Sequence, residues 1–145
     1  MPNYRGIIAI VTLAVALRVA AVFVLQSHTV PRSTYEHGEI AANLLEGRGF
    51  SIRFLGVDGP TSQQAPIYPL LVASAFALGG IDSPTSLLIL QLGQAVLGGL
   101  LALAVIVLVQ QIAPDRPRMA MFAGLIAALH PTLIYAATHV QVAGL

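Results

Sequence analysis

The chain contains no cysteine and no lysine, and only 9% of its 145 residues are charged. The absence of cysteine excludes disulfides, thiolate metal ligands and a cysteine nucleophile. A net charge of +1 provides no electrostatic footprint for nucleic acid, so we expect no nucleic-acid partner. The remaining composition is 57% hydrophobic, with a mean hydropathy of +0.83, which is typical of an integral membrane protein.

The first long apolar run covers residues 6–26. At about 1.5 Å per residue it is long enough to cross a hydrocarbon layer of roughly 30 Å, which predicts a transmembrane helix. A cleaved signal peptide is the alternative, because Arg5 forms a short basic region before the run. Arg18 interrupts the run and no clean small-residue cleavage site follows, which favours the transmembrane helix.

Two further runs, 84–112 and 119–138, predict a second and a third transmembrane helix. Ser83 is suited to cap the first of them, and Pro84 suits its first helical position, where the missing N–H costs nothing. Pro131 is expected to kink the last helix. Small residues four apart on 84–112 permit close approach of a neighbouring helix; they are the pairs Ala95/Gly99 and Gly98/Ala102.

Residues 27–83 predict an external loop with short helices of its own. The apolar stretch 69–81 reaches only about 20 Å as a helix and cannot cross the bilayer unaided, so we expect an interfacial or half-embedded helix over 69–80. This arrangement leaves Arg5 and the basic turn 115–118 on the cytoplasmic side. The expected class is therefore an all-α membrane protein with about three transmembrane helices and a cytoplasmic N-terminus.

Within the loop, a second short helix is expected over residues 34–46. Ser33 and Glu36 fit a capping box, and Gly47 supplies a left-handed stop. Such a helix would lie along the membrane surface with its acidic side chains in water. Composition and spacing alone favour Glu36 as a helix cap, because paired carboxylates are weak evidence of catalysis. The residues expected on the polar face are Glu36, Glu39, Asn43 and Glu46.

A series of short motifs in this loop resembles the first external loop of bacterial family 39 glycosyltransferases. These are GT-C membrane enzymes related to protein O-mannosyltransferases and to the lipid A aminoarabinose transferase. The similarity extends more loosely from Leu17-Arg18 to His130-Pro131 and Tyr135. The motifs are Tyr35-Glu36-x-Gly38-x-Ile40-Ala41, Gly47-x-Gly49-Phe50-Ser51, Gly59-Pro60-Thr61 and Ala65-Pro66-Ile67-Tyr68-Pro69-Leu70-Leu71.

The resemblance implies an inverting transfer of a sugar from a polyprenyl-phosphate donor to a lipid, protein or glycan acceptor on the non-cytoplasmic face. An acidic residue at the start of the loop helix, commonly aspartate, is the catalytic base in that family, and Glu36 matches it. Family members have many more transmembrane helices. The resemblance therefore also implies that this chain is the amino-terminal part of a longer protein of the bacterial inner membrane, and it leaves open whether the fragment is active alone.

Five further residues are candidate substrate-binding residues, each with a structural alternative. Arg18 would meet the phosphate of the lipid carrier, or it would snorkel or bond to carbonyls within the helix bundle. Arg48 and Arg53 would attract the same phosphate, or contact lipid headgroups. Tyr68 would contact substrate, or start and anchor the short helix. Glu39 would contact substrate, or belong to a solvated face.

We assign no cofactor and no metal site, because neither histidine pair has the one-turn spacing of a helical metal site. The histidine pairs are His28/His37 and His130/His139. The alternative to an enzyme is a non-catalytic small membrane protein, either a transporter subunit or an interaction partner that packs through its small-residue helix faces, or an inactive remnant. The absence of an internal repeat argues against transport, and the organised loop argues against a simple helper.

Overall fold

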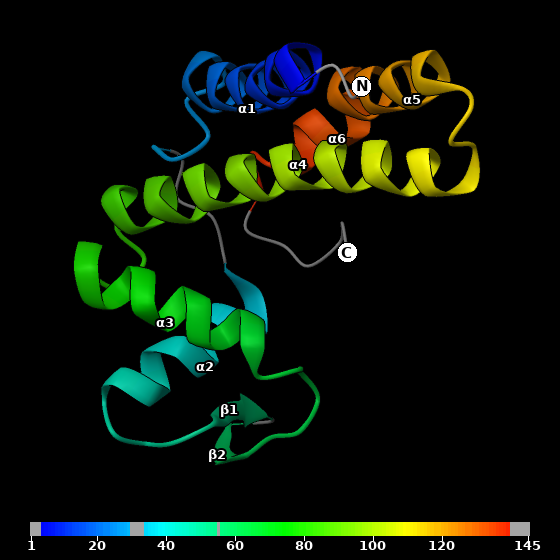
Figure 1. Cartoon of the computed structure of the whole chain (residues 1–145). Helices are drawn as coiled ribbons and strands as arrows, with labels where there is room; N and C mark the ends of the chain where they lie inside the picture. Colours follow the sequence, from blue (N-terminus) through cyan, green and yellow to red (C-terminus); the bar gives the residue numbers. More distant parts are fainter. Residues whose placement is uncertain (1–3, 30–33, 55, 140–145) are drawn as a thin grey trace. The chain divides into compact units, whose positions relative to one another are not determined.

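A computed structural model describes residues 4–29, 34–54 and 56–139. These residues are mostly helical, with one two-stranded hairpin (Figure 1). The elements in chain order are α1 (Tyr4–Val24), α2 (Tyr35–Leu45), β1 (Ser51–Phe54), β2 (Val57–Pro60), α3 (Ile67–Gly79), α4 (Pro84–Ile112), α5 (Pro117–Leu129) and α6 (Pro131–Ala136).

The chain forms two compact units. The described residues up to Ser27 and from Gln91 to His139 make the first unit, and those within His28–Leu90 make the second. Helix α4 contributes its first two turns to the second unit and the rest to the first. Each unit has its own packed core, and each is described by itself below.

Within the described part of the chain, two helices are long and apolar enough to cross a membrane. They are α1, with 21 residues and a hydropathy of 2.7, and α4, with 29 residues and a hydropathy of 2.5. Only 17% and 22% of their most apolar windows are buried, so they are unlike the core helices of a soluble domain. They correspond to the predicted spans 6–26 and 84–112, and they support membrane association.

The start of α4 follows the predicted capping chemistry. Its first residue is Pro84, and the backbone N–H of Ser86 donates to Oγ of Ser83 at 3.1 Å. Proline lacks the N–H that the first turn would leave unpaired, and the serine hydroxyl satisfies one of the other free donors. The N-terminus of this helix is therefore fixed by residues that the sequence identifies.

The predicted third span over 119–138 is divided in the structure. Helix α5 has 13 residues, a length of about 20 Å, and it ends at Leu129. His130 is extended, with ψ of 117°, and the short helix α6 begins at Pro131. A proline disfavours the helical conformation of the residue before it and removes one backbone donor. The expected kink is thus a complete break, and a single continuous helix over 119–138 is wrong.

The first unit is held together by close contacts between small residues. Helix α1 packs against α5 and α6, and the buried side chains of Ala14, Ala102 and Ala128 join α1, α4 and α5. A Cβ atom added at Gly99 would lie 2.5 Å from Cγ2 of Val15, so α1 approaches α4 more closely than any larger residue would allow. This confirms the close approach predicted from the small residues of α4.

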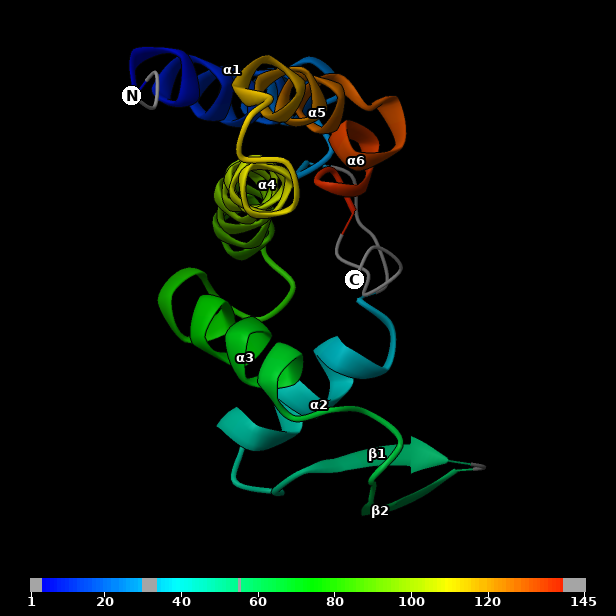
Figure 2. The same ribbon diagram turned by 45° about the vertical axis from the view of Figure 1, so that its right-hand side comes forward.

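In the second unit, α2 lies between α3 and the β1–β2 hairpin (Figures 1 and 2). Its core is built by one face of α2, one face of α3 and the first turns of α4. The hairpin strands pair antiparallel, with Ile52 opposite Gly59. The sequence analysis predicts the two short helices but not this hairpin. The buried residues of the core are Ala41, Val72, Ala73, Ala75, Phe76, Leu87 and Leu90.

Candidate functional site

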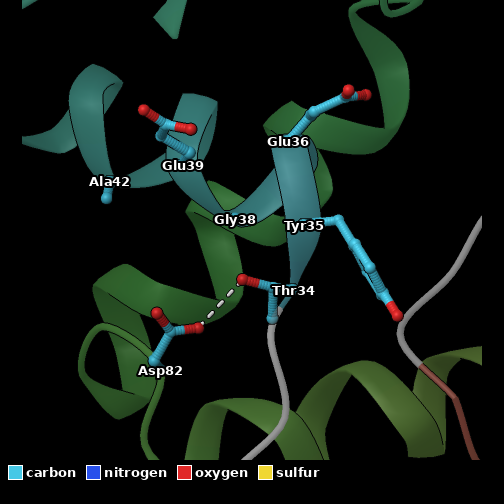
Figure 3. A pocket seen from close by; sticks show the side chains of 7 residues that line it. All are labelled: Thr34, Tyr35, Glu36, Gly38, Glu39, Ala42 and Asp82. Atoms are coloured by element: carbon cyan, nitrogen blue, oxygen red, sulfur yellow. Dashed lines mark hydrogen bonds between the residues drawn. The ribbon is translucent and has the colours of Figure 1, made fainter. Parts of the chain in front are cut away.

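An open depression of about 490 Å³ lies at the N-terminal part of α2 in the second unit (Figure 3). It brings the predicted site residues Glu36 and Glu39 to one place, together with Asp82 from the segment that leads into α4. The two glutamate side chains point in different directions rather than toward one another. The residues that line the depression are Thr34, Tyr35, Glu36, Gly38, Glu39, Ala42 and Asp82.

The carboxylate of Glu36 is exposed and does not cap its own helix. Its Oε2 accepts a hydrogen bond from the Nε2 amide of Gln64, and α2 has no side-chain hydrogen bond at its N-cap, Thr34. Ser33, the other half of the predicted capping box, lies outside the described residues. A side chain folded back onto the backbone would not be available to take a proton, whereas the Glu36 carboxylate is exposed and, in Figure 3, points away from Thr34 and Asp82.

Thr34 connects the start of α2 to the segment before α4. Its Oγ1 donates to Oδ1 of Asp82 at 3.0 Å, as the dashed line in Figure 3 shows. This contact depends on the glycine one helical turn later, because a Cβ atom at Gly38 would lie 1.5 Å from Oγ1 of Thr34. The residue type at position 38 therefore sets the geometry of the floor of the depression.

Two of the lining residues have unusual backbone conformations. Tyr35 has φ of 52° and Asp82 has φ of 49°, both in the left-handed region that non-glycine residues seldom adopt. Such conformations cost of order 1–3 kcal/mol and are found preferentially at functional sites. Their occurrence in one depression supports a functional role for this part of the second unit.

Glu39 and Arg53 are linked, although not as an ion pair. Oε1 of Glu39 accepts a hydrogen bond from the backbone N–H of Arg53 at 2.6 Å, which ties α2 to strand β1. The Arg53 side chain is exposed, and its Nε donates to the carbonyl of Gly56 at 3.5 Å. Glu39 thus has a structural contact as well as a place in the depression.

Arg48 is engaged at the C-terminal end of α2, away from the depression. Its guanidinium forms an ion pair with Glu46 and donates to Oδ1 of Asn43 at 2.6 and 3.0 Å. Asn43 is buried and donates in turn to the carbonyl of Ser51 at 2.8 Å. The sequence pattern predicts Asn43 on the solvated face of the helix, which is wrong, because its amide joins the helix to the hairpin.

Tyr68 lies on the buried side of α2 and not in the depression. Its ring meets the ring of His37 edge to face, with centroids 5.0 Å apart. His37 is only 7% exposed, and its Nδ1 has no hydrogen-bond partner. Burial lowers the pKa of His37 from its ordinary value, and the neighbouring Glu36 carboxylate offsets part of that shift.

Arg18 belongs to the first unit, where it is 1% exposed. Its Nη1 donates to the carbonyls of Ala14 at 2.8 Å and Ala128 at 3.3 Å, and its Nη2 donates to the carbonyl of Ala127 at 3.3 Å. Pro131 has no N–H to give to the carbonyl of Ala127, so the guanidinium supplies a donor where the helix break removes one. Arg18 therefore bonds to carbonyls within the helix bundle, which is one of the two roles expected from the sequence. The other role, a contact with the carrier phosphate, remains a prediction.

Thr34, Gln64 and Asp82 at the site, and His37 in the core beside it, have contacts for which the sequence alone predicts no role. Gln64 and Asp82 come from segments distant from α2 in the sequence, and no local pattern identifies them. The burial of His37, in contrast, can be predicted from the sequence, because His37 lies on the same helical face as the buried Ile40 and Ala41. Among the described residues, no group of three or more potential ligands is arranged to hold a metal ion.

Comparisons with protein-family models, curated proteins and solved structures give no match to this chain. The resemblance to family 39 glycosyltransferases therefore rests on the sequence motifs alone and remains a prediction.

Proposed function

We propose that this chain takes part in an inverting sugar transfer at the membrane surface, from a polyprenyl-phosphate-linked donor to an acceptor on the non-cytoplasmic face, with Glu36 as the catalytic base. The observation that carries the proposal is the state of the Glu36 carboxylate. Glu36 lines the depression, and its carboxylate is exposed, held by Gln64 through one oxygen and not used as a helix cap.

The proposed step needs one carboxylate and no covalent intermediate. An acceptor hydroxyl gives its proton to Glu36 while its oxygen forms a bond to the anomeric carbon of the sugar. The bond between that carbon and the phosphate oxygen breaks on the opposite face, and the polyprenyl phosphate leaves with the electron pair. The anomeric configuration is inverted, because attack and departure take place on opposite sides.

Three further features support this assignment. The depression is open and the Glu36 side chain is exposed, so an acceptor can approach the carboxylate. The left-handed backbones of Tyr35 and Asp82 hold its walls in conformations that local sequence preferences do not favour. The chain also contains two helices suited to a bilayer, and a polyprenyl-phosphate donor is confined to one.

The test is donor consumption by the chain reconstituted in vesicles that contain sugar-labelled polyprenyl phosphate and a mixture of hydroxyl acceptors. Glu36→Gln keeps the size of the side chain and its contact with Gln64 but cannot accept a proton, so we expect it to abolish release of polyprenyl phosphate. Glu46→Gln is the matched control, because it removes a carboxylate from the same helix outside the depression.

We expect Glu46→Gln to retain the turnover of the wild-type chain. Equal turnover of the wild type and Glu36→Gln would contradict the assignment of the base. Absence of donor consumption by the wild-type chain, combined with no binding of polyprenyl phosphate, would contradict the proposed function itself and favour the non-catalytic membrane protein.

A further inference from the structure

Helix α3 carries an exposed apolar stripe on the side opposite its packed face. Val72 and Phe76 are buried in the core of the second unit, whereas Ile67 is 74% exposed and Leu78 is 78% exposed. The exposed residues recur at helical spacing and therefore share one face. We define the α3 stripe as Ile67, Leu70, Leu71, Ser74, Ala77 and Leu78.

The side-chain hydroxyl of the α3 stripe has its hydrogen bond within the helix and does not require water. Its one hydroxyl, Oγ of Ser74, donates to the carbonyl of Leu70 at 2.8 Å, within the helix itself. In hydrocarbon each unsatisfied polar group costs several kcal/mol, and a serine bonded to the preceding turn avoids that cost. The stripe is thus compatible with a lipid environment although it contains a polar residue.

In the second unit, the charged residues near α2 and the uncharged helix α3 are separate. The sequence between Asp58 and Asp82 contains no charged residue, and α3 lies within this stretch. Helix α2 and its C-cap, by contrast, expose the carboxylates of Glu36 and Glu46. A unit that is apolar on one helix and acidic on the next is suited to the boundary between hydrocarbon and water.

The bilayer is also close to α3 along the chain. Helix α3 ends at Gly79, and α4, one of the two helices suited to cross a membrane, begins at Pro84. The first turns of α4 pack with Phe76 of α3 in the same core. The stripe is therefore carried by a helix that shares a core with the first turns of one of these two helices. With 13 residues, α3 reaches about 20 Å and is too short to cross roughly 30 Å of hydrocarbon.

We propose that the α3 stripe inserts among the acyl chains of a single leaflet and leaves the carboxylates of α2 on the aqueous side. The sequence predicts an interfacial helix in this region, and the structure assigns the face that enters the lipid. This inference does not depend on the proposed sugar transfer, since it concerns the surface that holds the second unit against the bilayer.

The chain has no tryptophan, so a single introduced tryptophan reports on one position only. Leu71→Trp and Leu78→Trp place the indole on the stripe, at exposed positions where it displaces no core side chain. Leu100→Trp on the exposed surface of α4 is the membrane reference, and Glu46→Trp on α2 is the aqueous control. Each variant is reconstituted in phosphatidylcholine vesicles with bromine near the carboxyl end or near the methyl end of the acyl chains.

We expect brominated lipid to quench Leu71→Trp and Leu78→Trp to an extent comparable with Leu100→Trp, and to leave Glu46→Trp unchanged. Bromine near the carboxyl end should quench the two stripe variants more strongly than bromine near the methyl end. Circular dichroism of each variant verifies that the helices are retained. Two stripe positions are used so that the result does not depend on one substitution.

Three outcomes would overturn the proposal. Water-like emission without quenching at both stripe positions would place the stripe in solvent. Emission shifted to the blue without quenching would mean that a protein surface, including a second copy of this chain, covers it. Stronger quenching of Leu71→Trp by bromine at the methyl end would mean that α3 extends to the centre of the bilayer.

Discussion

Arg18 of α1 crosses α4 at Gly98. A Cβ atom added at Gly98 would lie 2.1 Å from Nε of Arg18 and 2.5 Å from its Cδ, so the arginine occupies the space that any other residue would fill. Beyond this crossing, the guanidinium donates to the carbonyls of Ala127 and Ala128 at the end of α5. Because Gly98 has no side chain, the Arg18 side chain can pass α4 and donate to the last carbonyls of α5, where Pro131 ends the helix.

Gly98→Ala should destabilise the chain. The added methyl group forces the buried arginine to move and to lose its carbonyl partners, and overpacking of this kind costs about 1–3 kcal/mol. Gly93→Ala is the control on the same helix, because a Cβ atom there meets nothing within 4 Å. We expect that control to be neutral or stabilising by about 0.5–1 kcal/mol. Thermal unfolding in detergent measures both, and equal effects would contradict the crossing.

Arg18→Leu tests whether the arginine has a structural role. The carbonyl of Ala127 loses its donor, and a buried group left without a partner costs about 1–3 kcal/mol. We expect a lower unfolding temperature and an unchanged affinity of the folded variant for polyprenyl phosphate, measured by native mass spectrometry below the transition. Loss of that affinity with wild-type stability would instead assign Arg18 to the carrier phosphate.

Gln64→Leu should slow donor consumption without unfolding the second unit. The amide of Gln64 holds one oxygen of the Glu36 carboxylate, so its removal lets the carboxylate leave the position from which it would take the proton, and misplacement of a catalytic group lowers the rate. Gln63→Leu is the control, since Gln63 is exposed and does not line the depression. A rate for Gln64→Leu equal to that of Gln63→Leu would show that this contact does not position the base.

The buried His37 should make the stability of the second unit depend on pH. Burial lowers the pKa of His37 below its ordinary value of 6.5, with the neighbouring Glu36 offsetting part of the shift. The unfolded chain then binds a proton that the folded chain does not, so stability is complete above about pH 6.5 and falls as the pH is lowered toward the folded pKa.

His37→Phe keeps the ring contact with Tyr68 and removes the titrating group. We expect its unfolding temperature between pH 7 and pH 5 to vary less than that of the wild type. An identical pH profile for His37→Phe and the wild type would show that this histidine does not contribute.

Much of the helical architecture could be predicted from the sequence, because it follows from local rules. The length of the apolar runs locates α1 and α4, and Ser83 with Pro84 fixes where α4 begins. The break at His130 exceeds the expected kink, because the strength of a proline's effect depends on partners such as Arg18 that satisfy the freed carbonyl. The hairpin cannot be predicted in the same way, because its four-residue strands are too short to show a clear alternation of apolar and polar residues.

The candidate site could be predicted only in part. The acidic positions of α2 are visible in the sequence, but what each carboxylate contacts is decided by residues from other segments. Glu36 accepts a hydrogen bond from the Gln64 amide, and Glu39 accepts one from the backbone N–H of Arg53. Glu46 forms an ion pair with the guanidinium of Arg48. No local pattern predicts such pairings, because they depend on how the loop returns over the helix.

The most direct test of the account is chemical rescue of Glu36→Ala. Because this position is exposed, added formate can reach the space left by the carboxylate and accept the proton in its place. We expect Glu36→Ala to release no polyprenyl phosphate from the donor alone, and formate to restore release in proportion to its concentration. Wild-type release by Glu36→Ala without formate would contradict the role of Glu36 as the base.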